Sequence, residues 1–265
     1  MAFSIASYNV LADSYINPAW YGGVDPGALE AAHRHPALAE HIAALTADVL
    51  CLQEVEPDVF ELIQQRLRGS GHEGKYAGKG GRKPDGCATF VRTDRLALQA
   101  VQTLFYADGS SAQPSSGHIA LVTVVENEGR PVAVANTHLK WDAPGTPPAS
   151  QLGLRQIREL LDARARLAPA DASWIIGGDL NVTPTSAVVQ CLQAAGLRDA
   201  YAALPRVFTC NANRKARRID FLFHSADLTA TPLELPPIHD DTPLPSAAQP
   251  SDHLAIGAEF DRGQN

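Results

Sequence analysis

Six short polar motifs, each beside an apolar run, constrain the fold of this chain more than any other feature of its sequence. The motifs are Asn9, Gln53-Glu54, Asn136-Thr137-His138, Gly178-Asp179-Leu180-Asn181, Arg218-Ile219-Asp220 and Ser251-Asp252-His253. A short apolar run is typical of a buried strand, so each motif predicts polar side chains at a strand end. These ends can meet only if the first and last strands fold together, and no linker-like stretch divides them. We therefore expect residues 1–265 to form a single domain.

Composition limits the class of protein. With 265 residues and 45% hydrophobic content, the chain can bury a substantial core. Its 22 basic and 29 acidic residues argue against a protein that coats long nucleic acids, but leave short or small phosphorylated substrates open. The four cysteines are widely spaced without a Cys-x-x-Cys pair, which indicates neither a zinc cluster nor a disulfide framework.

The sequence also bears on location. It contains neither a basic segment followed by a long apolar stretch at the N-terminus nor a run of 18 apolar residues. We expect a cytoplasmic protein that does not associate with membranes, and no obligate protein partner is evident.

Hydrophobic periodicity predicts both helices and strands. Helices are expected over 27–46, 57–68, 150–167 and 185–195, with Ser150 capping the third. Strands are expected over 3–10, 49–54, 87–92, 119–126, 131–138, 173–178, 219–224 and 254–260. The Gly-rich, basic segment 69–85 and the segment 232–250, which contains six prolines, are expected to be loops. Hairpins mixed with helices over both halves favour a two-sheet α/β sandwich.

The polar residue types suit hydrolysis of a phosphate ester. This reaction needs a divalent cation, a group that prepares the water, and donors or cations that stabilise the phosphorus oxygens. Glu54 is the best candidate for a metal ligand, because it follows an apolar run and an ordinary solvent-exposed glutamate would not. A glutamate that caps a helix or forms a salt bridge is the alternative. Mg²⁺, or Mn²⁺ in its place, prefers one or two carboxylates with waters. Support is expected from Asn9, and Asp252 could be a further metal-side carboxylate.

Asp179 and Asn181 are two residues apart in an extended turn, so both can face one side of the site. Asp179 is expected to orient or deprotonate the attacking water, while the neutral amide of Asn181 can bind a phosphate oxygen. A turn-forming Asp-x-Asn before Pro184 is the alternative.

Two histidines at strand ends complete the predicted catalytic set. An imidazole paired to a carboxylate stays protonated and can stabilise phosphorane charge. We assign that pair to Asp220 and His253, and we expect His138 to be a second phosphate contact. Either histidine taken alone is more often structural.

Taken together, the motifs resemble those of the endonuclease/exonuclease/phosphatase superfamily. The resemblance implies a four-layer α/β sandwich, in which two mixed or antiparallel sheets are flanked by helices, with a Mg²⁺ site at the strand ends. The resemblance is closer to the nocturnin, Angel and deadenylase branch, whose members act on RNA 3′ ends, cyclic phosphate ends or nucleotide phosphates. It is carried by YNVLADSY at 8–15, LQEVE at 52–56, DGCATFVR at 85–92, NTHLKW at 136–141 and PSDHLAI at 250–256.

The sequence also departs from relatives of this superfamily. Leu11 stands where abasic-site enzymes carry a second metal acid, which argues against that repair role. The chain lacks the added domains of the eukaryotic poly(A) enzymes, so specificity for poly(A) is not implied. The basic segment 206–218 could read a terminal phosphate. Substrate contacts are expected from Lys83, Phe208, Asn211 and Arg218, although a core position for Phe208 is an equal alternative.

Three functions are consistent with these residues. The first is a Mg²⁺-dependent phosphodiesterase acting on RNA or a short oligonucleotide from the 3′ end. The second is a phosphatase for a small nucleotide, a terminal or cyclic RNA phosphate, or another phosphorylated metabolite. The third is a binding protein that keeps the fold without catalysis; the unsubstituted metal and histidine motifs argue against it.

Overall fold

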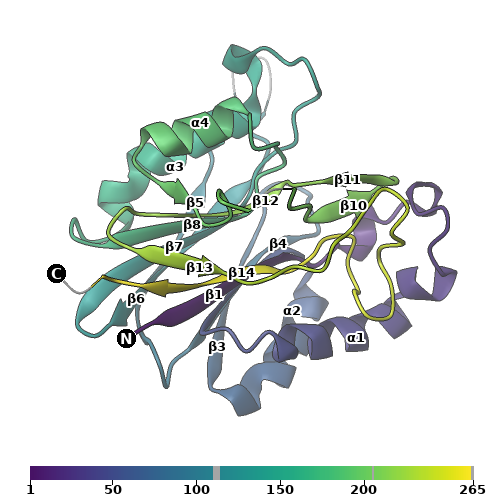
Figure 1. The fold of residues 1–265 in the computed structure, drawn as a ribbon, viewed down its shortest axis with the longest axis horizontal. Helices are drawn as coiled ribbons and strands as arrows, with labels where there is room; N and C mark the ends of the chain where they lie inside the picture. The colour runs from purple at the N-terminus through teal and green to yellow at the C-terminus, as the bar shows by residue number, and fades with distance from the viewer. Residues whose placement is uncertain (110–113, 205, 264–265) are drawn as a thin grey trace.

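The strands form two six-stranded sheets that pack face to face in a computed structural model describing residues 1–109, 114–204 and 206–263 (Figure 1). The first sheet has the order β13 (Thr229–Pro232), β14 (Ile256–Asp261), β1 (Phe3–Asn9), β2 (Val49–Val55), β4 (Gly86–Arg92) and β3 (His72–Gly78). The second has the order β5 (Ala97–Phe105), β6 (Ile119–Asn127), β7 (Arg130–His138), β8 (Ser173–Asp179), β12 (Asp220–His224) and β9 (Arg198–Asp199). A small hairpin of β10 (Cys210–Ala212) and β11 (Lys215–Arg217) stands apart from both sheets.

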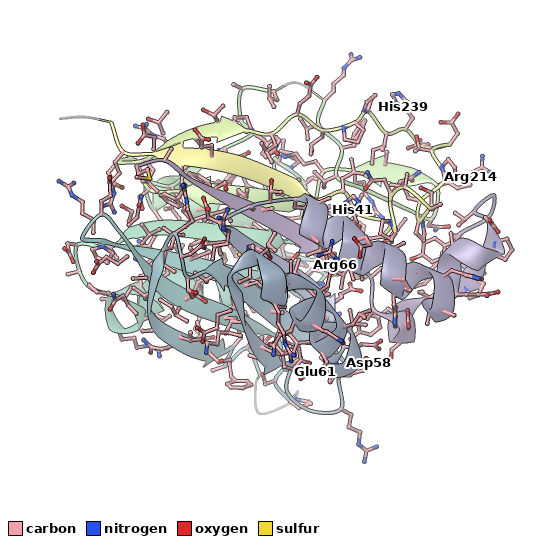
Figure 2. The ribbon with its side chains drawn as sticks, turned by 90° about the horizontal axis from the view of Figure 1, so that it is seen from below. His41, Asp58, Glu61, Arg66, Arg214 and His239 are labelled. Atoms are coloured by element: carbon pink, nitrogen blue, oxygen red, sulfur yellow. The ribbon has the colours of Figure 1, made fainter. Side chains whose placement is uncertain are left out.

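Helices cover the outer faces of the two sheets. The helices α1 (Ala31–Ala44) and α2 (Pro57–Leu67) lie on the first sheet, and α3 (Leu152–Leu167) and α4 (Ala187–Ala194) lie on the second (Figure 1). Charged side chains such as Asp58, Glu61 and Arg66 cover the solvent side of α2 (Figure 2). Short 3-10 turns η1 to η5 lie at Asp13–Tyr15, Pro18–Trp20, Pro26–Leu29, Arg68–Ser70 and Pro148–Ser150.

Alternation of side chains along the strands produces three apolar layers. In β1, Ala6 and Tyr8 face the helices, whereas Phe3 and Ile5 face the other sheet. The same division along the other strands gives one core between the sheets and one under each pair of helices. The four-layer α/β sandwich predicted from the sequence is therefore confirmed, with parallel pairing of β1 with β2 and of β7 with β8.

The hairpin expected over 119–138 is present as β6 and β7, but six strands were missed. Four of these, β9, β10, β11 and β13, have only two to four residues. The other two are longer. Residues 72–78, inside the expected loop 69–85, form the edge strand β3, and residues 97–105 form the edge strand β5. Edge strands pair on one side only, and most side chains of these two are at least partly exposed. They therefore lack the apolar run that marks a buried strand.

Three helices begin later than expected, and the third, α4, begins at Ala187 instead of residue 185. α1 begins at Ala31 instead of residue 27, because Asp25 caps the short 3-10 turn that precedes it. α3 begins at Leu152, and Ser150 does not cap it. The carboxylate of Asp142 accepts instead from the backbone amides of Leu152 and Gly153, at 3.0 and 2.9 Å.

No helix among the described residues combines the length and apolar character needed to span a bilayer.

Candidate active site

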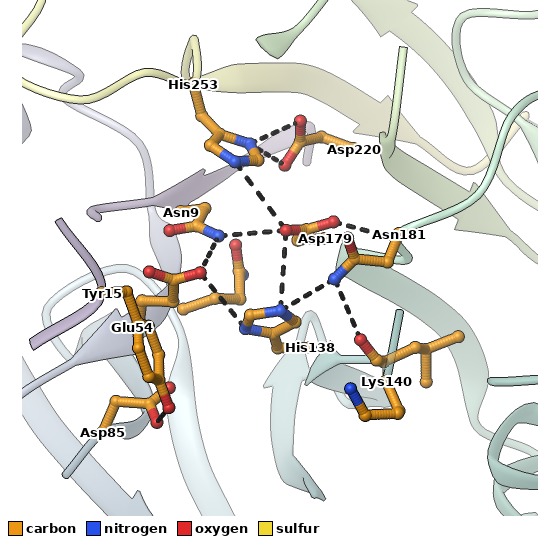
Figure 3. A network of polar contacts seen from close by, with 12 residues as sticks. Asn9, Tyr15, Glu54, Asp85, His138, Lys140, Asp179, Asn181, Asp220 and His253 are labelled. Atoms are coloured by element: carbon orange, nitrogen blue, oxygen red, sulfur yellow. Dashed lines mark hydrogen bonds and ion pairs between the residues drawn. The ribbon is translucent and has the colours of Figure 1, made fainter. Parts of the chain in front are cut away.

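The polar motifs meet at one edge of the sandwich because of how the strands run. The parallel pair β1 and β2 ends with Asn9 opposite Gln53, and the parallel pair β7 and β8 ends with His138 opposite Asp179. The antiparallel strand β12 begins at this same edge, with Asp220 opposite Asp179. Segments that are far apart in the sequence thus bring their polar ends together (Figure 3).

Glu54 reaches the site through an irregular backbone. Its φ is +57°, and the register of β2 against β4 shifts between Gln53 and Val55. A left-handed residue in a bulge redirects its side chain out of the strand alternation. Such a conformation costs on the order of 1 kcal/mol for a residue with a Cβ, and it recurs at functional sites.

The side-chain amide of Asn9 joins two carboxylates. Its Nδ2 donates to Glu54 Oε1 and to Asp179 Oδ2, both at 3.0 Å, and its Oδ1 accepts from the amide of Leu11 at 3.0 Å. The second oxygen of Glu54 accepts from the amide of Ala12 at 3.0 Å. Asn9 therefore links Glu54, the predicted metal ligand, to Asp179.

His138 is held between two donors. Lys79 Nζ lies 3.2 Å from its Nδ1, and Asn181 Nδ2 lies 2.9 Å from its Nε2. A neutral imidazole has one ring nitrogen that accepts, so the ring can accept a hydrogen bond from only one of these two donors. Burial, reinforced by the charge of Lys79, holds the pKa of His138 well below its usual range. Its Nε2 lies 3.7 Å from Asp179 Oδ2.

His253 is in the opposite charge state. Its Nδ1 lies 2.9 Å from Asp220 Oδ2 and 3.1 Å from Oδ1, which brings together the acid–imidazole pair expected from the sequence. The hydroxyl of Thr209 donates to Asp220 at 2.6 Å. Burial alone would lower the pKa of His253, but the charge of Asp220 and its hydrogen bond outweigh burial and hold the pKa well above its usual range.

Asp179 lies at the centre of the cluster (Figure 3). Its Oδ1 accepts from the amide of Asn181 at 2.9 Å, and its Oδ2 lies 3.8 Å from His253 Nε2. Burial, together with the charges of Asp220 and Glu54 and against the opposing charge of His253, raises the pKa of Asp179 to about 7. A carboxylate with a pKa near neutrality is suited to accept a proton from water.

The carboxylates of the cluster suit a divalent cation. Atoms of Glu54, His138 and Asp179 that could bind a metal lie within 4.8 Å of one another. Burial raises the pKa of Glu54, and Asp252 Oδ1 is buried without a hydrogen-bond partner among the described residues. Buried carboxylates at this density need a compensating charge, and carboxylate oxygens are what Mg²⁺ and Mn²⁺ prefer.

The four predicted substrate contacts fall in different places. Lys83 is half-buried at the cluster; burial, followed by the charge of Lys79, lowers its pKa. Asn211 lies behind Asp252, to whose carbonyl its backbone amide donates at 2.8 Å. Phe208 is 36% exposed and lines an apolar groove with Leu204.

Arg218 is not brought to the cluster. One of its terminal nitrogens donates to both oxygens of Asp199, at 2.6 and 2.7 Å, and its guanidinium lies 4.7 Å from the ring centroid of Phe221. The guanidinium is thus held by a structural ion pair, and the structure does not support the substrate contact predicted for this arginine.

Sequence reasoning gave no site role to Asp85, Tyr15 or Tyr21, which the structure brings to the cluster. Lys79, expected in a basic segment that could contact phosphate, forms a buried ion pair with Asp85 at 2.5 Å. Tyr15 donates to Asp85 at 2.6 Å, and Tyr21 donates to Asp252 at 3.1 Å. Asp85 comes just before an apolar strand, as Asp220 does. This shared position is the sequence signal from which a site role for Asp85 could have been predicted.

The chain matches the Endonuclease/Exonuclease/phosphatase family over residues 6–253. It belongs to this family of hydrolases that act on phosphate esters. Among curated relatives, it is 30% identical to the CCR4-Not complex 3′-5′-exoribonuclease subunit Ccr4 of Debaryomyces hansenii, over 71% of this chain and 26% of that protein. It is 27% identical to Protein angel homolog 2 of Mus musculus, over 82% of this chain and 41% of that protein. The chain thus spans well under two thirds of these relatives.

Solved structures agree with the fold. A structure of ANGEL2, described as a 2′,3′-cyclic phosphatase in complex with adenosine-2′,3′-vanadate, matches with a TM-score of 0.84 and 23% identity, over 98% of this chain and 95% of that one. The catalytic domain of human Nocturnin, with bound sulfate, matches with a TM-score of 0.74 and 25% identity, over 98% and 93%. The resemblance to the nocturnin, Angel and deadenylase branch is thereby confirmed.

Proposed function

We propose that this protein is a Mg²⁺-dependent phosphoesterase that hydrolyses phosphodiester bonds of RNA or short oligonucleotides from the 3′ end. The observation that carries the proposal is the arrangement around Asp179. A neutral imidazole and a cationic one present Nε2 atoms 3.7 and 3.8 Å from the same carboxylate oxygen. Such a site can remove a proton from water and donate to phosphate oxygens at the same time.

Each residue then has a distinct role. Asp179 accepts the proton of the attacking water, since its pKa of about 7 leaves a substantial fraction ionised at neutral pH. His253, kept protonated by Asp220, donates to the phosphorus oxygens as negative charge develops on them. His138 and the amide of Asn181 add neutral groups that can contact phosphate oxygens.

The cation would be held by Glu54, with Asn9 fixing that carboxylate and Asp252 contributing from the other side. When bound, the cation neutralises phosphate charge and stabilises the leaving oxygen. Mn²⁺ is expected to substitute for Mg²⁺, because both accept carboxylate and water ligands.

The names of relatives support this proposal without deciding the substrate. The Ccr4 relative is named as a 3′-5′-exoribonuclease subunit, whereas the ANGEL2 structure is described as that of a 2′,3′-cyclic phosphatase. As part of the proposal, residues 1–265 act as one cytoplasmic domain without an obligate protein partner.

A second candidate is a phosphatase for a terminal or cyclic RNA phosphate, a small nucleotide or another phosphorylated metabolite. It is favoured by the lysines near His138. Lys79 lies 3.2 Å from this histidine, and the charges of Lys83 and Lys140 act on the neighbouring His118. A terminal phosphate monoester carries more negative charge than a diester, so these three lysines would bind a monoester more favourably.

A hydrolysis panel distinguishes the two candidates. The substrates are an RNA oligomer with a 3′-hydroxyl, the same oligomer with a 3′- or 2′,3′-cyclic phosphate, and free nucleotide phosphates, each with Mg²⁺, Mn²⁺ or EDTA. Stepwise shortening of the RNA supports the exoribonuclease. Release of phosphate, or opening of the cyclic phosphate, with the RNA length unchanged supports the phosphatase.

The control is a matched pair of glutamates. Glu54→Gln should lower turnover by about 10²-fold or more, because the amide cannot replace the carboxylate as a metal ligand. Glu73→Gln changes an exposed glutamate on β3 and should retain full activity. If both variants match the unmodified protein, or if no substrate is hydrolysed with either metal, the proposal is wrong.

A further inference from the structure

A buried thiol lies beside the cationic histidine of the cluster. Cys210, the first residue of β10, stands directly opposite His253 in an antiparallel bridge. The backbone hydrogen bonds on either side of this bridge measure 2.8 and 2.6 Å. Two residues that face each other in this way carry their side chains on the same face of the pair, close together. The backbone therefore fixes the thiol next to the imidazole.

The thiol completes a group of three possible metal ligands. Ligand atoms of Cys210, Asp252 and His253 lie within 4.8 Å of one another, and all three residues are buried. His253 Nε2 lies 4.0 Å from Asp252 Oδ1. A tetrahedral Zn²⁺ with bonds of about 2.0–2.3 Å holds its ligand atoms roughly 3.3–3.8 Å apart. The three donors would therefore need to approach one another by only about 1 Å to bind such an ion.

One of the three donors carries a buried oxygen without a partner. Tyr21 donates to Asp252 Oδ2 at 3.1 Å, while Oδ1 has no hydrogen-bond partner among the residues that the structure describes. A buried carboxylate oxygen without a donor is unfavourable, and a cation compensates it. An ion held by the three donors would lie about 2 Å from each of them, inside the cluster itself.

The surroundings of His253 suit a metal ligand. Its Nδ1 lies 2.9 Å from Asp220 Oδ2, and Thr209 donates to the same carboxylate at 2.6 Å. A histidine that binds a metal usually donates its other ring N–H to a carboxylate, which fixes the ring and leaves one nitrogen for the ion. The free nitrogen here is Nε2, which points toward Asp179 in the candidate active site (Figure 3). An ion that enters the active site therefore reaches it directly.

The sulfur decides which metal this group selects. Mg²⁺ takes oxygen ligands, whereas thiolate and imidazole together are typical ligands of Zn²⁺. The group thus differs in chemistry from the Mg²⁺ site proposed at Glu54, although the two share Asp252. Because only one of the three ligands is a cysteine, the spacing of cysteines in the sequence does not reveal this site.

We infer that Cys210, Asp252 and His253 form an inhibitory site for a thiophilic divalent cation such as Zn²⁺. The ion replaces the proton of the thiol and the Nε2 proton of His253, and both protons go to solvent. His253 can then no longer donate to phosphorus oxygens, and Asp252 is withdrawn from the Mg²⁺ site. Binding follows from the three ligands alone, whereas the inhibition rests on the proposed function.

Cadmium binding tests the site without an activity assay. Cd²⁺ bound to a thiolate absorbs in the ultraviolet through sulfur-to-metal charge transfer, and the protein is titrated with Cd²⁺ in the absence of Mg²⁺. The band should appear in the unmodified protein and in Cys191→Ser, which changes the half-buried cysteine of α4. It should be absent from Cys210→Ser. A band that persists in Cys210→Ser, or no band in the unmodified protein, would overturn the site.

Zinc affinity provides the second measurement, by competition with a chromogenic chelator. Cys210→Ser should weaken Zn²⁺ binding by about 10²-fold, since even supporting residues of zinc sites contribute up to this much. Cys210→Ala repeats the test with a smaller side chain, and thermal unfolding without metal checks that each variant is folded. Equal Zn²⁺ affinities of the unmodified protein and both variants would also overturn the site.

Inhibition is measured as hydrolysis at a fixed Mg²⁺ concentration and rising Zn²⁺, relative to the rate of each variant without Zn²⁺. The half-inhibitory Zn²⁺ concentration should rise about 10²-fold in Cys210→Ser and stay the same in Cys191→Ser. An unchanged value in Cys210→Ser would mean that Zn²⁺ acts at another site, and the inhibitory role would be wrong.

Failure of this inference is distinguishable from failure of the proposed function. A cadmium band that depends on Cys210, in a protein that hydrolyses none of the substrates, keeps the metal site and removes the proposed function. Hydrolysis by a protein without the band keeps the function and removes the metal site.

Discussion

At the scale of single residues, the candidate site depends on keeping two histidines in opposite charge states. Burial, reinforced by the charge of Lys79, keeps His138 neutral, while the charge of Asp220 keeps His253 cationic against burial. The two rings approach Asp179 from different elements, and the charged neighbour on the far side of each ring differs in sign.

Asp220→Asn tests whether His253 acts through its positive charge. The amide keeps the size of the carboxylate but removes the charge that offsets burial of His253, so the pKa of His253 should fall. The imidazole then loses its proton at lower pH, and we expect the high-pH limb of the kcat profile to move to lower pH. We expect kcat at neutral pH to fall about 10²-fold or more.

A kcat profile over pH checks this expectation, with Asp94→Asn as the control because Asp94 pairs with Arg92 on the surface. An Asp220→Asn profile that keeps the shape of the unmodified one would show that His253 does not act through its charge.

Stability measurements test the buried ion pair of Lys79 and Asp85 that lies beside the neutral His138. Both side chains are almost fully buried, so Lys79→Met leaves a buried carboxylate that keeps Tyr15 as its side-chain donor among the described residues. Breaking such a pair costs about 3–5 kcal/mol, whereas replacing both partners by apolar residues costs less. The double variant Lys79→Met/Asp85→Leu should therefore be more stable than the single variant Lys79→Met.

Urea unfolding of the four proteins in this double-mutant cycle measures the coupling. Additive free energies of unfolding would mean that the two side chains are not coupled in the folded protein.

At the scale of elements, the site depends on where β8 ends. Gly178 precedes Asp179 with a φ of +139°, and a Cβ there would lie 1.8 Å from the carbonyl oxygen of Thr137 on the parallel strand β7. Only glycine therefore lets the two strands pair up to the residues that carry His138 and Asp179.

Gly178→Ala should separate these strand ends, and we expect it to abolish activity and to destabilise the fold strongly. Gly129 is the matched control: its φ is +75°, but a Cβ there would meet no atom within 4 Å. Gly129→Ala should cost only about 1–2 kcal/mol of backbone strain. Thermal unfolding and the hydrolysis assay together check both variants; similar losses in the two would refute the steric explanation.

Arg34 of α1 is a second link between elements. It is buried, and its guanidinium donates to the carbonyls of Val10 and Pro250, at 2.8 and 3.5 Å, and to the carboxylate of Asp13. These acceptors lie next to Asn9 in one segment and next to Ser251 in the other. A helix that carries no predicted site residue thus ties together the two ends of the chain that supply the site.

At the scale of the whole molecule, burial of histidines outside the site makes stability depend on pH. Burial lowers the pKa of His41, His72 and His224 in the folded protein. Below about pH 6.5 these three histidines take up protons in the unfolded chain but not in the folded one, so their contribution to the free energy of unfolding should fall as the pH drops through this value.

Urea unfolding at pH 7.5 and at pH 5.5 measures this loss. His72→Gln should make it smaller, whereas His33→Gln, at an exposed position, should not change it. A loss that is the same in both variants would show that His72 does not contribute.

The sequence by itself determined the strands that carry the site and most of the residues in it. Short apolar runs such as those before Asn9, Glu54 and His138 are typical of buried strands, and a polar residue at the end of such a run is expected at a strand end. Pairing of Asp220 with His253 followed from the chemistry that an imidazolium requires. These features depend on local pattern and residue type, which a sequence displays directly.

Only the tertiary structure decided which charges meet. Lys79 and Asp85 lie in a segment without apolar periodicity, and the contact of Lys79 with His138 depends on the pairing of β3 with β4. Arg218 was separated from the site by Asp199, a residue that gave no signal in the sequence. Edge strands and ion pairs are set by neighbours that are distant along the chain, and a periodicity within one segment carries no information about them.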